Sequence, residues 1–163
     1  MARRRPGSQP QATLIHPNDP SITTVVRKPK NSEKGALKTI LAANRRAIEV
    51  YDASGQPALE EDGSKRVYIE QGWPIEATRE FLRIHFVSHD GVLDSDGSPL
   101  VMNFTGESPT ADEYTEPWLD VIEPAEEGKP TPAPISYASW IIREVRKPET
   151  FTVNPPAAAS ATS

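Results

Sequence analysis

Hydrophobic positions after Ser32 recur at helical spacing and predict the first helix of the chain. Glu33 suits the first turn of this helix, whereas Gly35 weakens it. The apolar positions that follow the helical spacing are Ala36, Leu37, Ile40, Leu41, Ala43, Ala47 and Ile48. We expect the helix to end near Ala43, because residues 45–51 also suit a strand.

Short apolar runs separated by turn sequences predict strands in the middle of the chain. Residues 66–70 are rich in β-forming side chains, and residues 80–104 have the pattern of a long hairpin. Residues 75–89 are open to two interpretations, because their apolar positions fit a helix that starts at Pro74 nearly as well as a half-buried strand. Residues 118–122 form a further short apolar element.

A second helix is predicted near the C-terminus, behind a proline-rich spacer. Residues 123–135 contain alternating prolines, a composition typical of a semi-rigid polyproline II linker. Residues 136–147 follow as a helix that Ser136 is able to cap. One face of this helix carries the apolar stripe Tyr137, Trp140, Ile141 and Val145. The stripe either packs on the chain's own core or docks on another subunit, because Trp and Tyr are favoured anchors at interfaces.

The N-terminal segment, residues 1–31, has the composition of an extended arm. It contains five prolines, and each removes a backbone donor and moves its predecessor out of the helical region. Its apolar cluster predicts a short strand at 21–27 that is able to add to a sheet edge. At the other end of the chain, residues 148–163 form a low-complexity tail without charged side chains from Asn154 onward.

These patterns predict a small α+β protein with a strand-rich core at 32–122 and one or two helices. The chain has 163 residues, which is enough for one domain with flanking segments. Its hydrophobic fraction of 36% is low. Its 17 prolines are about twice the usual share. We therefore expect the N-terminal arm, the spacer-mounted helix and the tail to lie outside the compact core.

Charge is distributed unevenly along the chain. Residues 1–46 hold ten cations and two anions, a net charge of +8, whereas residues 47–163 carry −13, which gives the overall −5. A basic arm on an acidic body indicates a molecule that binds an acidic surface, either nucleic acid or the body of a neighbouring copy. The candidate partner-binding residues are the arm cations Arg3, Arg4, Arg5, Arg27, Lys28 and Lys30, together with the helix stripe Tyr137, Trp140, Ile141 and Val145.

No pattern in the chain predicts catalysis or a bound cofactor. Cysteine is absent, which excludes disulfides and thiolate chemistry. The spacing of His85 and His89 permits two metal ligands on one face, but it defines no third ligand, so a small metal-dependent enzyme is only a distant alternative. The sequence also lacks a nucleophile elbow and a glycine-rich phosphate loop. We therefore expect a non-enzymatic protein without metal or cofactor.

The layout predicts a structural protein that joins a multi-subunit complex of protein subunits through its arms. A virion accessory protein of a tailed phage, such as a head-decoration or head–tail protein, fits this architecture. The alternative is a nucleic-acid-associated protein that binds through residues 1–31 and loses affinity with salt. No apolar run is long enough to span a membrane, and prolines follow the N-terminal arginines where an export signal would be apolar. We expect the virion or the cytoplasm as the location.

Overall fold

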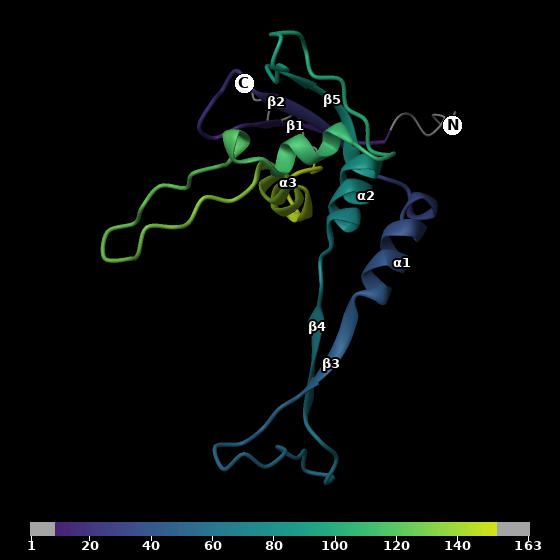
Figure 1. The fold of residues 1–163 in the computed structure, drawn as a ribbon, viewed down its shortest axis with the longest axis vertical. Helices are drawn as coiled ribbons and strands as arrows, with labels where there is room; N and C mark the ends of the chain where they lie inside the picture. Colours follow the sequence, from purple (N-terminus) through teal and green to yellow (C-terminus); the bar gives the residue numbers. More distant parts are fainter. Residues whose placement is uncertain (1–8, 153–163) are drawn as a thin grey trace, which may run out of the picture.

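The computed structural model describes residues 9–152 (Figure 1). In this range five strands lie in two sheets and three α-helices are accompanied by short 3₁₀ helices. The strands are β1 (Gln11–Ile15), β2 (Thr23–Arg27), β3 (Arg45–Glu49), β4 (Val67–Gln71) and β5 (Phe86–Asp90). The helices are η1 (Asn31–Glu33), α1 (Gly35–Ala43), α2 (Ile75–His85), η2 (Thr110–Thr115), η3 (Pro117–Leu119) and α3 (Tyr137–Arg146). The mixed α+β fold class is as predicted.

The central sheet has the strand order β1–β2–β5 and is antiparallel throughout. Its middle strand, β2, contains the β-branched run Thr23, Thr24, Val25 and Val26, which suits a strand paired on both sides. The pairing of β2 with β5 shifts register between Val25 and Val26. One face of this sheet covers the hydrophobic core, because Val26 and Leu14 are buried there among helical residues.

The boundary of the predicted N-terminal arm needs a correction. The strand expected at 21–27 exists as β2. It is the middle strand of the central sheet, however, and does not lie at the edge of a sheet as predicted. Pro17 and Pro20 lie in the turn between β1 and β2, so they leave the hydrogen-bonded ladder intact. Residues 1–8, with the candidate cations Arg3, Arg4 and Arg5, lie outside the described residues, as do residues 153–163.

Residues 75–89 turn out to be a helix followed by a strand. Pro74 has extended backbone and precedes α2, whose last residue is His85. Phe86 then adopts φ −70° and ψ 135° and begins β5. Because residues 80–85 belong to α2, the prediction of a long hairpin at 80–104 is wrong, and within this range the structure has only a bridge between Leu93 and Pro99.

Helix α3 closes the core by packing against α2 and η2. Ser136 caps it as predicted, because its hydroxyl accepts a hydrogen bond from the Ser139 amide at 3.1 Å. The long loop that precedes the helix leaves the body on one side and is closed at its base by a bridge between Val121 and Ile135 (Figure 1). Within the described part of the chain, no helix is long and apolar enough to cross a bilayer.

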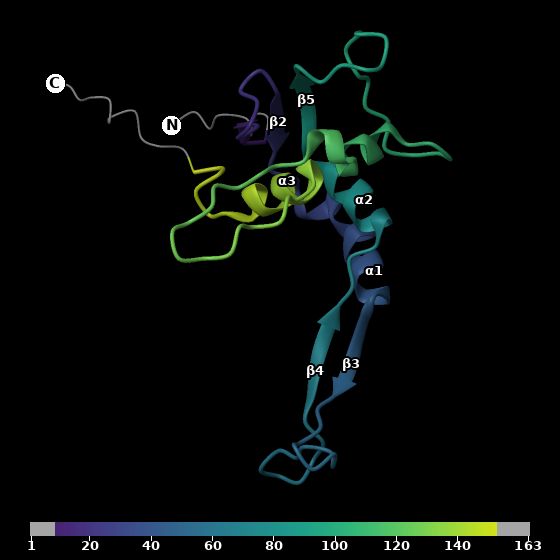
Figure 2. The same cartoon turned by 60° about the vertical axis from the view of Figure 1, so that its left-hand side comes forward.

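The second sheet is a two-stranded hairpin of β3 and β4 that stands away from the body (Figures 1 and 2). It follows α1 directly and leads back into α2, so both of its ends join the helical side of the core. We call residues 45–71 the arm and residues 49–66, at its far end, the tip. The arm places a large part of the chain outside the core.

Candidate functional site

The arm makes no contribution to the hydrophobic core. No residue in the range 45–71 is buried. Its large apolar side chains are exposed on the strands and at the tip: Tyr51 59%, Leu59 55%, Val67 48%, Tyr68 53% and Ile69 56%. A two-stranded hairpin without a packed face is marginally stable in water. The exposed apolar side chains of the arm are therefore a surface that a partner is able to bury.

Both faces of the arm combine an apolar pair with charged side chains. Ile48 lies opposite Tyr68 on one face, and Ala47 lies opposite Ile69 on the other. Arg46 and Glu70, which are also opposite each other, form an ion pair beside the Ile48–Tyr68 pair. Such cross-strand pairs stabilise the hairpin modestly. Because neither face is covered, the arm has the mixed character of an interaction surface.

The tip holds its shape through backbone hydrogen bonds among three chain segments. The Val50 amide donates to Arg66, the Arg66 amide donates to Ala58, and the Ala58 amide donates to Val50, at 2.8 to 3.0 Å. Two turns of the same kind join these segments. In each, an aspartate accepts the amide and the hydroxyl of a serine two residues later: Asp52 with Ser54, and Asp62 with Ser64. The tip is thus an internally bonded structure at the end of the arm.

The tip is acidic. Residues 49–66 hold five carboxylates and two cations. The two cations, Lys65 and Arg66, form ion pairs with Glu49 and Glu60. This leaves three carboxylates without an ion pair inside the described structure: Asp52, Glu61 and Asp62. The tip therefore presents net negative charge next to the exposed side chains of Tyr51 and Leu59.

A cleft of about 270 Å³ lies where α1, α2 and α3 meet the segment after β2. We call it the basic cleft. Its lining is Lys28, Pro29, Lys34, Leu37, Phe81, Ile84, His85, Val145, Arg146 and Phe151. Most of this lining is apolar, and the described residues that form it include no carboxylate and no hydroxyl group. The cleft therefore combines an apolar wall with cationic side chains and an imidazole.

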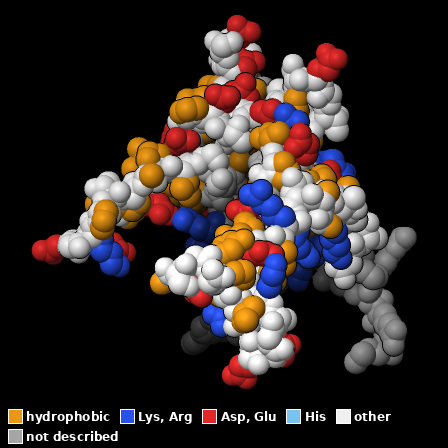
Figure 3. Space-filling view, turned by 60° about the horizontal axis from the view of Figure 1, so that its bottom comes forward, with side chains coloured by type: hydrophobic (Ala, Val, Ile, Leu, Met, Phe, Trp, Pro, Cys, Tyr) orange, Lys and Arg blue, Asp and Glu red, His pale blue; other side chains and the backbone are white. Residues whose placement is uncertain are grey.

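The basic cleft contains three cations, Lys28, Lys34 and Arg146, that form no ion pair among residues 9–152. The Arg146 guanidinium lies 5.9 Å from the centre of the Phe81 ring, which lines the cleft, and 4.9 Å from the centre of the Trp73 ring, so cation–π contacts hold it against aromatic side chains. In Figure 3, Lys and Arg side chains gather near the centre of the face shown, and many Asp and Glu side chains lie at the ends of projecting loops. These charges favour an acidic ligand that carries an apolar group.

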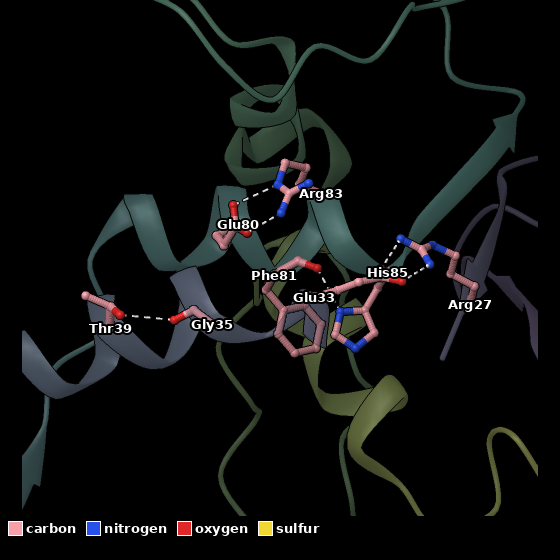
Figure 4. Close-up of polar contacts among 8 residues, drawn as sticks. All are labelled: Arg27, Glu33, Gly35, Thr39, Glu80, Phe81, Arg83 and His85. Atoms are coloured by element: carbon pink, nitrogen blue, oxygen red, sulfur yellow. Dashed lines mark hydrogen bonds and ion pairs between the residues drawn. The ribbon is translucent and has the colours of Figure 1, made fainter. Parts of the chain in front are cut away.

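His85 forms one side of the basic cleft. Its ring stacks on that of Phe81 at a centroid distance of 4.0 Å, and its Nδ1 lies 2.8 Å from the Phe81 carbonyl oxygen (Figure 4). The ion pair of Arg27 with Glu33, at 2.5 Å, lies beside these rings. Burial lowers the pKa of His85 below its ordinary value, and the nearby cations Lys34, Arg27 and Arg146 lower it further. The imidazole is therefore neutral at pH 7.

The lowered pKa of His85 predicts a loss of stability on mild acidification. The unfolded chain binds a proton near the ordinary pKa of 6.5, whereas the folded chain binds it only at lower pH. The stability is therefore full above about pH 6.5 and falls as the pH drops toward the folded pKa. We expect His85→Gln to remove this fall, measured by urea denaturation of both proteins between about pH 7 and pH 5. Identical pH profiles would contradict the assignment.

Three cations of the predicted N-terminal segment, residues 1–31, lie at the basic cleft or close to it in the sequence. Lys28 lines it, Arg27 lies next to it in the ion pair with Glu33, and Lys30 is exposed nearby in sequence. The fold brings Lys28 together with Lys34 and Arg146, which come from other segments of the chain. The sequence pattern did not identify these two, because only the packing of α1 and α3 against α2 places them in one cleft with Lys28.

The helix stripe predicted to bind a partner lies in the chain's own core, and this is a correction. Tyr137 and Ile141 are 0% exposed, Trp140 is 7% and Val145 is 8% exposed. Of the two interpretations that the amphipathic pattern left open, α3 follows the one in which it packs on the body. An apolar face on a helix indicates that another surface covers it, but it does not identify that surface. Here α2, η2 and the central sheet provide that cover.

The two histidines considered as metal ligands are both bonded to protein groups. His89 lies on β5 and its ring nitrogens contact the Tyr114 hydroxyl and the Leu100 carbonyl. His85 lies at the end of α2 and contacts the Phe81 carbonyl. Within residues 9–152, no group of three His, Asp or Glu side chains is placed to hold a metal ion.

Sequence analysis also missed the arm, although it predicted strands in both of its halves. The signal that identifies it is the position of charged residues. Arg45 and Arg46 are adjacent in β3, so they point to opposite faces of the hairpin, and Glu70 adds a charge in β4. A strand with one buried face shows alternating apolar and polar residues. Charges on both faces indicate a hairpin that no core covers.

No protein-family model, curated protein or solved structure significantly matches this chain.

Proposed function

We propose that the protein is a non-enzymatic assembly subunit that joins a multi-subunit protein complex through its arm. The observation that carries this proposal is the absence of any buried residue in 45–71. A partner that covers the arm would bury its exposed tyrosine, leucine and isoleucine side chains, which stabilises both the hairpin and the complex. Among residues 9–152, no further strand pairs with the outer edges of β3 and β4, so a strand of the partner is able to add there.

The proposed setting is a shell or connector built from many small subunits. Projecting arms let a small body bury more surface against its neighbours than the body alone offers. A head-decoration or head–tail protein of a tailed-phage virion has this architecture, and we propose such a role by analogy of architecture alone.

The unpaired cations support a second candidate function, the binding of nucleic acid. Lys28, Lys30, Lys34, Lys38 and Arg45 all lie within 28–45, and none forms an ion pair in the described part of the chain. Several such cations are able to neutralise phosphates, with an affinity that falls steeply with salt. Against this candidate, the acidic tip lies at the end of the arm that starts next to these cations.

An arm-less variant tests the proposed function. Residues 46–70 are replaced by the turn Asn-Gly, which connects the paired residues Arg45 and Gln71. We expect an unchanged thermal unfolding midpoint, because the arm contributes no buried residue. The wild type and the variant are each produced in the cells in which the gene naturally occurs, with the variant in place of the native gene. Both proteins are then purified and compared by sedimentation velocity. The wild type is expected to sediment in a complex with protein subunits, and the arm-less variant as a free monomer.

Two outcomes of this experiment contradict the proposal. One is a wild-type protein that sediments as a free monomer, since no partner then covers the arm. The other is a complex that forms equally well without the arm. Nuclease treatment before sedimentation separates the two candidate functions, because a complex held together by nucleic acid falls apart and a protein complex does not.

A further inference from the structure

We propose that the acidic tip of one copy of this protein occupies the basic cleft of a second copy. This inference rests on the proposed function, because it identifies the partner that the arm binds. It joins two surfaces that lie far apart on the same chain: a projecting hairpin end with unpaired carboxylates, and an apolar cleft with unpaired cations.

The size of the basic cleft favours a protein side chain as its occupant. Its volume of about 270 Å³ lies below the roughly 300 to 1,000 Å³ of ordinary small-molecule sites. Its apolar lining, from Leu37, Phe81 and Ile84 among others, suits one large apolar side chain. Many hot spots of protein interfaces are anchor side chains that fill a desolvated pocket of the partner.

The tip matches the cleft in both chemistry and charge. Leu59 is 55% exposed and Tyr51 is 59% exposed, so each is able to act as the anchor. Asp52, Glu61 and Asp62 have no ion pair in the described structure, and neither have Lys28, Lys34 and Arg146 of the cleft. Three negative charges thus accompany the apolar side chains of the tip, and three positive charges accompany the apolar lining of the cleft. Such complementarity steers the encounter and fixes its register.

The contact must form between two copies. The cleft-lining residues Lys34 and Leu37 lie at the start of α1, whereas the arm begins after the end of this helix and extends away from the body (Figures 1 and 2). Its five paired residues per strand span about 17 Å at roughly 3.4 Å per residue. The tip therefore lies far from the cleft of its own chain. Binding of a tip to the cleft of the next copy is a head-to-tail contact, which generates a ring or a filament.

Two complementary variants of the full chain test this inference. The tip variant is Leu59→Ala with Glu61→Lys, and the cleft variant is Lys28→Glu with Lys34→Glu. Matched controls reverse charges elsewhere: Glu127→Lys on the long loop, and Lys38→Glu on α1 outside the cleft lining. Each protein is produced recombinantly, freed of nucleic acid, checked by thermal unfolding, and measured by light scattering up to millimolar concentration.

We expect the wild type and both controls to form salt-sensitive oligomers, whereas the dissociation constant of each test variant rises about tenfold or more. In a head-to-tail contact the tip variant retains a functional cleft, and the cleft variant retains a functional tip. An equimolar mixture of the two variants is therefore expected to form a one-to-one dimer at a concentration at which each variant alone is monomeric. Recovery of association in this mixture distinguishes the contact from any isologous dimer that uses one surface only.

Three results would overturn the inference. A pure wild type that stays monomeric at every concentration excludes self-association, and the proposed function then survives only if the complex from native cells depends on the arm. Association that persists in either test variant excludes the tip–cleft contact. Association that is lost in Trp118→Ala but kept in the tip variant assigns the contact to the exposed Trp118 surface instead.

Discussion

Replacement of Tyr137 by alanine is expected to destabilise the fold by roughly 3 to 5 kcal/mol, the range for truncation of a large buried aromatic residue. Tyr137 is 0% exposed, and its ring contacts those of Tyr114 at 4.8 Å, His16 at 5.0 Å and Trp140 at 5.8 Å. Its hydroxyl lies 2.6 Å from that of Thr24 on the central strand. The substitution leaves a cavity between α3 and the sheet, and it is measured by chemical denaturation.

Tyr137→Phe is the matched control, because it removes the hydroxyl and keeps the ring. We expect it to cost about 1 to 3 kcal/mol, since the buried Thr24 hydroxyl loses a partner. Burial also raises the pKa of Tyr137 to about 12, so this hydroxyl stays protonated through the neutral range. If α3 were a detachable docking helix, Tyr137→Ala would leave the stability unchanged, and that result would contradict the observed packing.

The second large effect is expected at Gly91, which follows β5 with a φ of +80°. A Cβ atom at this position would lie 2.1 Å from the Ser21 carbonyl oxygen and 3.1 Å from the Cα of Ile22. Both are backbone atoms in the connection just before β2, so the clash cannot be relieved by a side-chain rotation. We expect Gly91→Ala to cost roughly 3 to 5 kcal/mol, as overpacking adds to the strain of a positive φ.

Gly97→Ala separates these two contributions. Gly97 has nearly the same backbone conformation, with a φ of +79°, but a Cβ atom there meets nothing within 4 Å. We expect this variant to cost only about 1 to 2 kcal/mol, the strain of the left-handed region. The difference in the free energy of unfolding between the two variants measures the close approach of Gly91 to the backbone of Ser21 and Ile22. Equal losses would show that the two backbones move apart.

Local signals predicted those elements that depend on neighbouring residues in the chain. The capping residue Ser136 and the apolar stripe after it defined α3 within one residue of its start. The β-branched cluster around Val25 identified β2. The pattern from 75 to 89 fits both a helix that starts at Pro74 and a strand, because both place Leu82 and Phe86 on the same face.

Local signals could not predict contacts between segments that are far apart in the chain. The prolines of the first 31 residues indicated an arm, yet Pro17 and Pro20 only form the turn that lets β1 pair with β2. The stripe of α3 indicated an apolar partner, but the pattern is the same whether that partner is α2 or another subunit. The projecting hairpin at 45–71 could not be predicted for the same reason. The sequence predicts strands in both of its halves, but it does not show that these strands pair only with each other.

The sequence by itself determined the α+β class, the separation of charge along the chain, and the positions of β2 and α3. These properties follow from propensity, periodicity and composition, which act over a few residues. Only the tertiary structure decided that α3 belongs to the core, that the arm is residues 45–71, and that Lys28, Lys34 and Arg146 share one cleft. These are matters of which surfaces meet. The free energy of burial depends on the total apolar area that two surfaces remove from water. It does not require any fixed spacing of residues in the sequence, so no sequence pattern predicts which surfaces meet.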